Sequence, residues 1–297
     1  MNPDAKRHAA PARVELSNGV ELHYIDKGRG PTVILLHGGM GDCCSWAGQM
    51  DSLAANFRTI AYSRRHSHPN RNQPGEAAHT LGIDIEDLLA IEQQLRVGPA
   101  HLVGTSYGAL VALAFALAHP DMTLSLVLAE PPLHRWACRT PLGALLYAAF
   151  MGNVWRPAAR AFDLGDERSA LQLLTDGIWG RAIFDVLPSS RRDVILRNAA
   201  SMRALTRSPD PFPDLQRNAV AKVAVPTLLV HGEHASELHR YVIDELARVI
   251  PAAARAEIAG AGHGSTQENP DGFRDAVLAF LDAPISHGDS GAAGQTK

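Results

Sequence analysis

The sequence predicts an α/β fold with a mostly parallel central sheet, helices on both faces and an inserted helical lid. Apolar runs typical of buried strands alternate with segments of helical spacing from residue 32 to residue 132. The alternation pauses over residues 133–217, where only helical segments are found, and resumes at Pro226. Ahead of it, residues 14–24 alternate around Asn18-Gly19, a strong signal for an antiparallel hairpin.

The expected elements follow the chain in order. After the hairpin, strands are predicted at residues 32–36 and 58–62, up to Val103, and at residues 124–129, 226–230 and 255–258. Their apolar runs are continuous rather than alternating, which indicates a sheet covered on both faces. Helices are predicted at residues 45–57, 83–95, 111–118, 237–250 and 270–281, with two clear lid helices at 142–151 and 168–178.

These elements divide the chain into a core, a lid and two tails. The core comprises residues 13–132 and 218–283, and the helical lid residues 133–217. Residues 1–12 and the Gly/Ser-rich residues 284–297 are predicted to be flexible tails. The lid holds 12 arginines, no lysine and 8 acidic residues, so its net charge is +4 in a chain of net charge -3.

The composition excludes several functional classes. A net charge of -3 over 297 residues argues against a general nucleic-acid binder. Three cysteines cannot form a disulfide framework, and none has zinc-site spacing. No apolar run is long enough to cross a bilayer, and the first residues have no apolar signal core. We expect a cytoplasmic protein that acts on a small molecule without nucleic acid, membrane or metal; its oligomeric state is left open.

The most informative motif is Gly104-Thr105-Ser106-Tyr107-Gly108, which joins a predicted strand to a predicted helix. This spacing puts Ser106 at the tip of a very tight turn, in a strained backbone conformation. Glycines are needed two residues before and after it, because side chains there would collide with the neighbouring strand or helix. The amide of Tyr107 then lies at a helix N-terminus, ready to face negative charge.

Other polar residues also follow strands directly. His37, Glu130, Glu233 and His263 each come just beyond the carboxyl end of a predicted strand. Parallel sheets bind ligands at that edge, so we expect these residues to converge on Ser106. The loop at residues 63–70, which includes Arg64, is expected to be mainly solvated.

Four segments together resemble the α/β-hydrolase fold family with a helical lid. They are His37-Gly-Gly-Met-Gly, Gly-Thr-Ser-Tyr-Gly108, Val230-His-Gly-Glu233 and Gly262-His263 with Glu268-Asn-Pro270 behind it. The resemblance covers roughly residues 13–283 and is weakest in the lid. It implies a Ser–His–acid triad, an acyl-enzyme mechanism and no cofactor.

Within this resemblance, Ser106 is the nucleophile and His263 is the base that activates it, in the chain order Ser…acid…His. The backbone amides of Gly39 and Tyr107 are expected to form the oxyanion hole, with Met40 as the nearest rival to Gly39. His37 is interpreted as a structural residue of the oxyanion loop.

The acid departs from the common pattern. Most relatives carry an aspartate after the strand that ends at Val230, but here that position is Ala235. Glu130, after the preceding strand, is the preferred candidate, and Glu233 or Glu237 remains an alternative. Haloalkane dehalogenases and the hydrolases of the lactone zearalenone resemble this arrangement, with a glutamate at that strand end.

The predicted function is a cofactor-independent serine hydrolase of a carboxylic ester or lactone. Carbon–carbon bond hydrolases and perhydrolases share these residues and stay open. A ligand-binding protein of this fold with little turnover is the rival from another class, supported by Ala235. Dehalogenases and epoxide hydrolases are disfavoured because each needs an aspartate at the position of Ser106.

Overall fold

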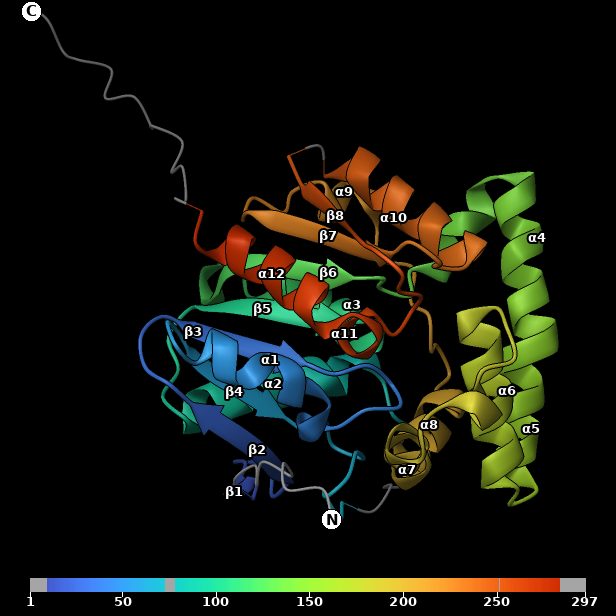
Figure 1. The fold of residues 1–297 in the computed structure, drawn as a ribbon, viewed down its shortest axis with the longest axis horizontal. Helices are drawn as coiled ribbons and strands as arrows, with labels where there is room; N and C mark the ends of the chain where they lie inside the picture. The colour runs from blue at the N-terminus through green and yellow to red at the C-terminus, as the bar shows by residue number, and fades with distance from the viewer. Residues whose placement is uncertain (1–9, 73–77, 251, 284–297) are drawn as a thin grey trace, which may run out of the picture.

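The structure is a computed structural model that describes residues 10–72, 78–250 and 252–283. Within those residues one sheet of eight strands has the order β1-β2-β4-β3-β5-β6-β7-β8 (Figure 1). The strands are β1 (Ala12–Glu15), β2 (Glu21–Lys27), β3 (Thr32–Leu36), β4 (Arg58–Tyr62), β5 (Ala100–Thr105), β6 (Thr123–Ala129), β7 (Thr227–Gly232) and β8 (Ala254–Ile258). The predicted hairpin and mostly parallel sheet are confirmed: β1 and β2 pair antiparallel, β2 pairs antiparallel with β4, and all later pairs are parallel.

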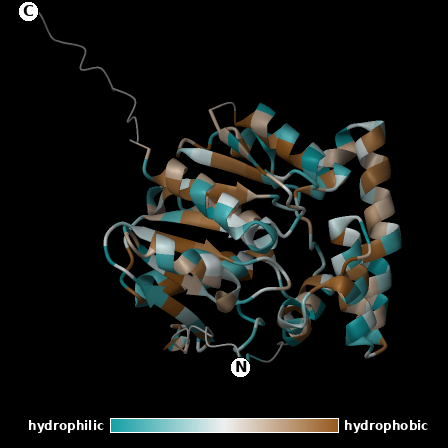
Figure 2. Cartoon of the chain, viewed as in Figure 1, coloured by the Kyte–Doolittle hydropathy of each residue, from teal (hydrophilic) through white to brown (hydrophobic). Residues whose placement is uncertain are grey.

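Helices cover both faces of the sheet, as predicted. One face packs against α1 (Ala47–Leu53) and α12 (Pro270–Leu281), with the short α11 (Ser265–Glu268) beside them (Figure 1). The other packs against α2 (Leu81–Gln94), α3 (Tyr107–Ala118) and α10 (Glu237–Val249). Apolar residues run along the strands between these layers (Figure 2). The buried apolar side chains accordingly form two clusters, one on each face of the sheet.

The lid is inserted between β6 and β7 and lies beside the carboxyl ends of the strands (Figure 1). It begins with a 3₁₀ turn at His134–Arg139 and contains α4 (Pro141–Phe150), α5 (Arg156–Asp163), α6 (Glu167–Trp179), α7 (Ser189–Arg197) and α8 (Ala199–Thr206). A π-helical turn, Met151–Trp155, joins α4 to α5, and the short α9 (Arg217–Val220) follows the lid. These helices cover the edge of the sheet at which the sequence predicts the site.

A buried polar contact fixes the lid to the core. The Asp42 side chain is fully buried and accepts hydrogen bonds from Arg197 (2.8 Å) and Asn198 (3.0 Å) at the junction of α7 and α8. Asn198 in turn accepts one from the backbone amide of His68 at 2.8 Å. Since Asp42 belongs to the loop that follows β3, the lid is anchored next to the predicted oxyanion loop.

Two predicted boundaries differ from the structure. The helix expected over residues 45–57 is a 3₁₀ turn, Cys43–Trp46, followed by α1, because the Asp42 side chain caps the turn at Cys44. The strand β1 begins at Ala12, inside the predicted tail; residues 1–9 and 284–297 of the two tails lie outside the described residues. No helix of the described residues is long and apolar enough to span a membrane.

Candidate active site

The predicted strained turn is present between β5 and α3. Ser106 has φ 50° and ψ -123°, a left-handed conformation that is unusual for a residue with a side chain. A Cβ on Gly104 would lie 2.5 Å from the Gly108 carbonyl, and one on Gly108 would lie 2.1 Å from the carbonyl of Leu36. Both glycines are therefore required for the backbone of α3 to approach β3 and β5 this closely. The turn lifts Ser106 clear of the sheet, at the N-terminus of α3.

Glu130 follows β6 and contacts His263 directly. Its side chain is 2% exposed; one carboxylate oxygen accepts a hydrogen bond from His263 Nδ1 at 2.7 Å, and the other accepts one from the Gly232 amide at 2.9 Å. Glu130 also has a positive φ, 47°, like Ser106 on the neighbouring strand. Burial alone would raise the pKa of Glu130, but the hydrogen bond and charge of His263 and the Gly232 amide lower it below its usual value. The carboxylate is thus held ionised against the imidazole.

The alternative acids lie elsewhere. Glu233 is exposed, and its carboxylate accepts a hydrogen bond from the Gly260 amide at 2.7 Å. Glu237 is exposed at the N-terminus of α10, and Ala235 is buried. Among the described residues, Glu130 is the one carboxylate that hydrogen-bonds to His263.

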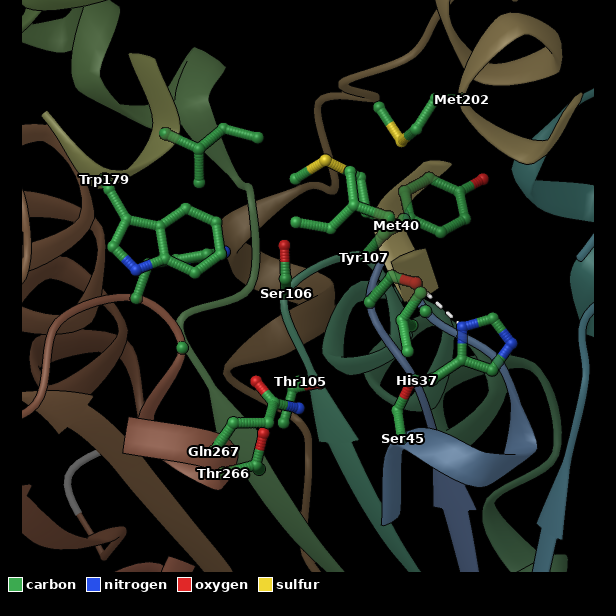
Figure 3. A pocket seen from close by; sticks show the side chains of 18 of the residues that line it. His37, Met40, Ser45, Thr105, Ser106, Tyr107, Trp179, Met202, Thr266 and Gln267 are labelled. Atoms are coloured by element: carbon green, nitrogen blue, oxygen red, sulfur yellow. Dashed lines mark hydrogen bonds between the residues drawn. The ribbon is translucent and has the colours of Figure 1, made fainter. Parts of the chain in front are cut away.

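Ser106 and His263 line one cavity between the core and the lid, with a volume of about 510 Å³. Figure 3 shows the Ser106 side chain pointing into it, between Trp179 on one side and Met40 and Tyr107 on the other. The indole of Trp179 stands edge-on to the His263 ring, with centroids 5.3 Å apart. Within the described residues the Ser106 hydroxyl makes no hydrogen bond to the imidazole, a contact that is often long until substrate binds.

The residues of the expected oxyanion hole line the same cavity. Gly39 and Tyr107 both line it, and neither of their amides donates a hydrogen bond within the described residues. The same is true of Met40, so the choice of Gly39 over Met40 stays a prediction. A Cβ on Gly39 would lie 2.6 Å from Met202 Sδ of α8, which shows how tightly the lid packs on this loop.

His37 is enclosed behind the loop. It is 1% exposed; its Nδ1 lies 2.8 Å from the Gly38 carbonyl, and its Nε2 lies 3.0 Å from the Arg64 amide that donates to it. Burial, aided by the charge of Arg64, lowers its pKa to about 3, so the ring is neutral. These contacts agree with its interpretation as a structural residue of the oxyanion loop.

A buried polar network supports the other side of the turn. The Tyr107 hydroxyl donates to Asp84 at 3.0 Å, and the same carboxylate oxygen lies 2.8 Å from His79 Nε2. Arg64 forms an ion pair with Asp84 at 3.7 Å, and its guanidinium lies 4.7 Å from the centre of the Tyr107 ring. Arg64 is 2% exposed, so the prediction of a solvated loop is wrong for this residue. An ionic residue could be buried there because Asp84 on α2 neutralises it, which the local sequence does not reveal.

Two further buried histidines lie behind the Glu130–His263 pair, His239 against both residues and His134 against His239. The His239 ring stacks on that of His263 with centroids 4.3 Å apart, and its Nδ1 lies 3.6 Å from Glu130. Burial and the neighbouring His263 lower the pKa of His239 to about 3, so it is neutral. His134 packs against His239 and is 2% exposed; burial lowers its pKa well below the usual value.

The Glu130, His239 and His263 side chains could also hold a metal ion, because their ligand atoms lie within 4.8 Å of one another. A metal bound there would have to replace the 2.7 Å hydrogen bond between His263 and Glu130. This hydrogen bond fixes the orientation of the His263 ring, which lines the cavity. The same residues can therefore form either a metal site or a Ser–His–acid site, but not both.

Comparison with known proteins identifies the family. The family model described as "Alpha/beta hydrolase family" matches residues 33–276. The chain belongs to this family. The alpha/beta hydrolase fold, with its parallel sheet and inserted helices, is therefore shown as the sequence predicted.

Several alpha/beta hydrolases of stated activity are similar to the chain. Carboxylesterase YbfK of Bacillus subtilis is 26% identical over 84% of this chain and 80% of its own length. Epoxide hydrolase 3 of Xenopus tropicalis is 26% identical over 89% of this chain and 75% of its own length. The crystal structure of the enol-lactonase from Burkholderia xenovorans LB400 superposes with a TM-score of 0.72 at 22% identity, over 91% of this chain and 99% of that chain. That structural likeness concerns the fold.

The fold brings together all five residues predicted for the site: Ser106, Glu130, His263, Gly39 and Tyr107. The positions of Asp84 and of the buried His134 and His239 next to them were not predicted. Asp84 lies in the first turn of α2 and accepts a hydrogen bond from Tyr107, which is 23 residues away in the sequence. No short-range motif signals such a contact.

Proposed function

We propose that this alpha/beta hydrolase is a cofactor-independent serine hydrolase that cleaves a carboxylic ester or a lactone through an acyl-enzyme intermediate. Ser106 is the nucleophile, His263 the base and Glu130 the acid. The observation that carries this proposal is the buried 2.7 Å hydrogen bond between Glu130 and His263, at the wall of the cavity into which Ser106 points.

Acylation follows from that arrangement. The Ser106 oxygen attacks the carbonyl carbon and its proton passes to His263 Nε2, while Glu130 holds the Nδ1–H and stabilises the imidazolium. The amides of Gly39 and Tyr107 bind the oxyanion; one such donor is typically worth about 3 kcal/mol of transition-state stabilisation. The intermediate collapses, the bond to the leaving oxygen breaks, and that oxygen takes the proton from His263.

Deacylation repeats these steps with water. His263 removes a proton from the water molecule, the hydroxide attacks the acyl carbon, and the Ser106 oxygen leaves and recovers its proton from His263. The products are a carboxylic acid and an alcohol, or a hydroxy acid if the substrate is a lactone. No redox step or added reactant other than water is needed.

Relatives of stated activity support an ester or lactone over an epoxide. A carboxylesterase and an enol-lactonase are among the similar proteins. Epoxide hydrolases are similar too, but they resemble one another in using an aspartate as nucleophile, and this chain has Ser106. Carbon–carbon bond hydrolysis or perhydrolysis at the same residues is the second candidate. A ligand-binding protein of this fold was suggested by Ala235; the hydrogen bond between His263 and Glu130 supports the enzyme, because it offers an acid from another strand end.

The proposal is tested by labelling with a fluorophosphonate and by turnover of 4-nitrophenyl acetate. We expect wild type to label and turn over, and Ser106→Ala to do neither. Glu233→Gln is a control for the choice of Glu130 as the acid. It removes an exposed carboxylate at the end of the next strand and should behave like wild type. Wild type that neither labels nor hydrolyses any ester would refute the proposal and favour a binding protein.

A further inference from the structure

The walls of the active-site cavity carry one permanently charged side chain among the described residues, Arg191. No Asp or Glu lines this cavity, and the His37 and His239 rings in its wall are neutral. Much of the remaining wall is apolar, including Trp155 and Phe212 under the lid. A single cation in such a wall produces a positive potential, which the nearby Glu268 offsets only in part.

Arg191 lies close to the proposed base. It belongs to the first turn of α7, and its guanidinium donates a hydrogen bond to Gln267 Oε1 at 3.2 Å. A Cβ on Gly264, the residue after His263, would lie 2.9 Å from Arg191 Nη2. The guanidinium thus packs on the backbone that carries His263, and Figure 3 shows its partner Gln267 on the cavity wall beside Thr266.

The nearby acid is engaged elsewhere. Glu268 accepts hydrogen bonds from the Trp179 indole and from the Gly262 amide, the latter at 2.6 Å. A Cβ on Gly264 would lie 3.1 Å from Glu268 Oε1 as well as 2.9 Å from Arg191 Nη2, so the two side chains are close, but in the described part of the chain they form no ion pair. Burial lowers the pKa of Arg191, and the charge of Glu268 opposes this only in part. Arg191 therefore keeps an incompletely neutralised charge.

Four lid arginines are half-buried, and the other three have acidic or carbonyl partners. Arg203 forms an ion pair with Glu167, Arg217 forms one with Glu245, and Arg192 donates to the carbonyls of Asp185 and Leu187. Arg191 has only the neutral amide of Gln267 as a side-chain partner among the described residues. A partly desolvated guanidinium of this kind is costly unless an anion pairs with it.

We propose that Arg191, with Gln267 and the neighbouring Ser190, binds a carboxylate of the substrate, so that the enzyme acts on esters or lactones that carry a free carboxylate. The planar guanidinium fork matches a carboxylate and can bind it through two parallel hydrogen bonds. A phosphate monoester would bring a second negative charge, and the cavity wall offers one cation for it. One turn further along α7, Val194 and Ile195 line the cavity, so the part of the substrate between its two polar ends contacts apolar side chains.

This inference rests on the proposed function, and the test separates the two. Mono(4-nitrophenyl) adipate and 4-nitrophenyl hexanoate have acyl chains of equal length, and only the first ends in a carboxylate. The measured quantity is the ratio of their kcat/KM values. In wild type we expect a ratio well above one, and in Arg191→Gln a ratio lower by about 10- to 100-fold, mainly through KM, because a charge-assisted hydrogen bond is lost.

Arg192→Gln is the matched control for Arg191→Gln. It removes the same charge from the next residue, whose side chain does not line the cavity. It should leave the ratio within about twofold of wild type, because only a direct contact distinguishes two substrates that differ by one terminal group. Arg191→Lys should give an intermediate ratio, since lysine keeps the charge without the planar fork. An unchanged ratio in Arg191→Gln, or equal losses in both glutamine variants, would overturn the inference while leaving the hydrolase proposal intact.

A binding measurement decides the case in which no ester is hydrolysed. Calorimetry of Ser106→Ala with monomethyl adipate should show binding that is weakened at least tenfold by adding Arg191→Gln and unaffected by adding Arg192→Gln. That result would support the carboxylate subsite even if the hydrolase proposal failed. Absence of binding, or binding independent of Arg191, would refute the subsite.

Discussion

In the described part of the chain, two histidines with buried side chains are hydrogen-bonded to a buried carboxylate, and the two pairs differ in what lies beyond the imidazole. Glu130 and His263 are 2.7 Å apart, and Asp84 and His79 are 2.8 Å apart. His263 opens into the cavity that holds Ser106, whereas His79 is enclosed and its second ring nitrogen has no hydrogen-bond partner in the described residues. A His–carboxylate hydrogen bond is thus not a sign of catalysis by itself. Access to a nucleophile and to substrate makes the difference.

The two pairs are nevertheless connected through Tyr107. Tyr107 lines the cavity next to Ser106, and its hydroxyl donates to Asp84. Asp84 has its pKa lowered from 3.8 to about 2: burial opposes ionisation, but the hydrogen bond and charge of His79, the charge of Arg64 and the Tyr107 hydroxyl outweigh it. We call Glu130–His263 the outer pair and Asp84–His79 the inner pair. We infer that the inner pair, through Tyr107, stabilises the turn that carries Ser106, the residue on which the outer pair acts.

We expect the largest loss of activity from a substitution that breaks the outer pair. Glu130→Gln keeps the size of the side chain but removes the charge that stabilises the imidazolium and fixes its orientation. We expect kcat for 4-nitrophenyl acetate to fall at least about 100-fold, with a melting temperature close to that of wild type. Steady-state kinetics and calorimetry measure the two quantities. Activity equal to wild type would return the acid role to Glu233 or Glu237.

Breaking the inner pair should give the opposite pattern. Asp84→Asn leaves Arg64 buried without its counter-charge, so we expect the free energy of unfolding to fall by about 3 kcal/mol. Turnover of the remaining folded protein should change far less than in Glu130→Gln. Urea unfolding followed by fluorescence provides the measurement, and a variant as stable as wild type would contradict the structural role assigned to Asp84.

This stabilisation should also depend on pH. Asp84 has a folded pKa below its unfolded value, so its contribution to stability is present above pH 3.8 and is lost as the pH falls toward 2.

The pKa of another buried carboxylate, Glu92, is shifted in the opposite direction. Glu92 on α2 is fully buried, both its oxygens lack a hydrogen-bond partner in the described residues, and burial raises its pKa from 4.5 to about 8.

Glu92→Gln is therefore expected to stabilise the protein at alkaline pH. With a raised folded pKa, the stability linked to Glu92 is fully present below pH 4.5 and declines as the pH rises through 8. The variant lacks that decline, so at pH 9 it should be more stable than wild type by about 2 kcal/mol, part of the gain being offset by its buried amide. At pH 5 the two proteins should differ little. Unfolding curves at both pH values check this; equal stabilities at pH 9 would contradict it.

These contrasts show where sequence reasoning succeeds. The alternation of strands and helices, and the position of each strand end, follow from local apolar patterns, so the fold and the meeting of Ser106, Glu130 and His263 at one edge were predicted. The relocated acid was also predicted in position, because Ala235 removed the usual one. Its catalytic role stays a prediction until tested.

What the sequence could not provide depends on contacts across the chain. Arg64 was expected in a solvated loop, yet it is buried because Asp84, twenty residues later, neutralises it. The orientation of Arg191 into the cavity depends on how α7 of the lid packs against the loop after β8, which no periodicity specifies. Burial of a charge is decided by its partner in space and not by its neighbours in sequence.

The smallest expected effect tests the link between the two pairs. Tyr107→Phe keeps the aromatic ring next to Arg64 and the backbone amide proposed for the oxyanion hole, and removes only the hydroxyl that donates to Asp84 at 3.0 Å. We expect the free energy of unfolding to fall by about 1 to 2 kcal/mol, because a hydrogen bond to a buried charge is lost. Turnover should fall less than tenfold, since the proposed oxyanion donor is the amide. A loss of activity as large as that of Glu130→Gln, with unchanged stability, would show instead that the hydroxyl acts in the reaction and that the inner pair belongs to the catalytic machinery.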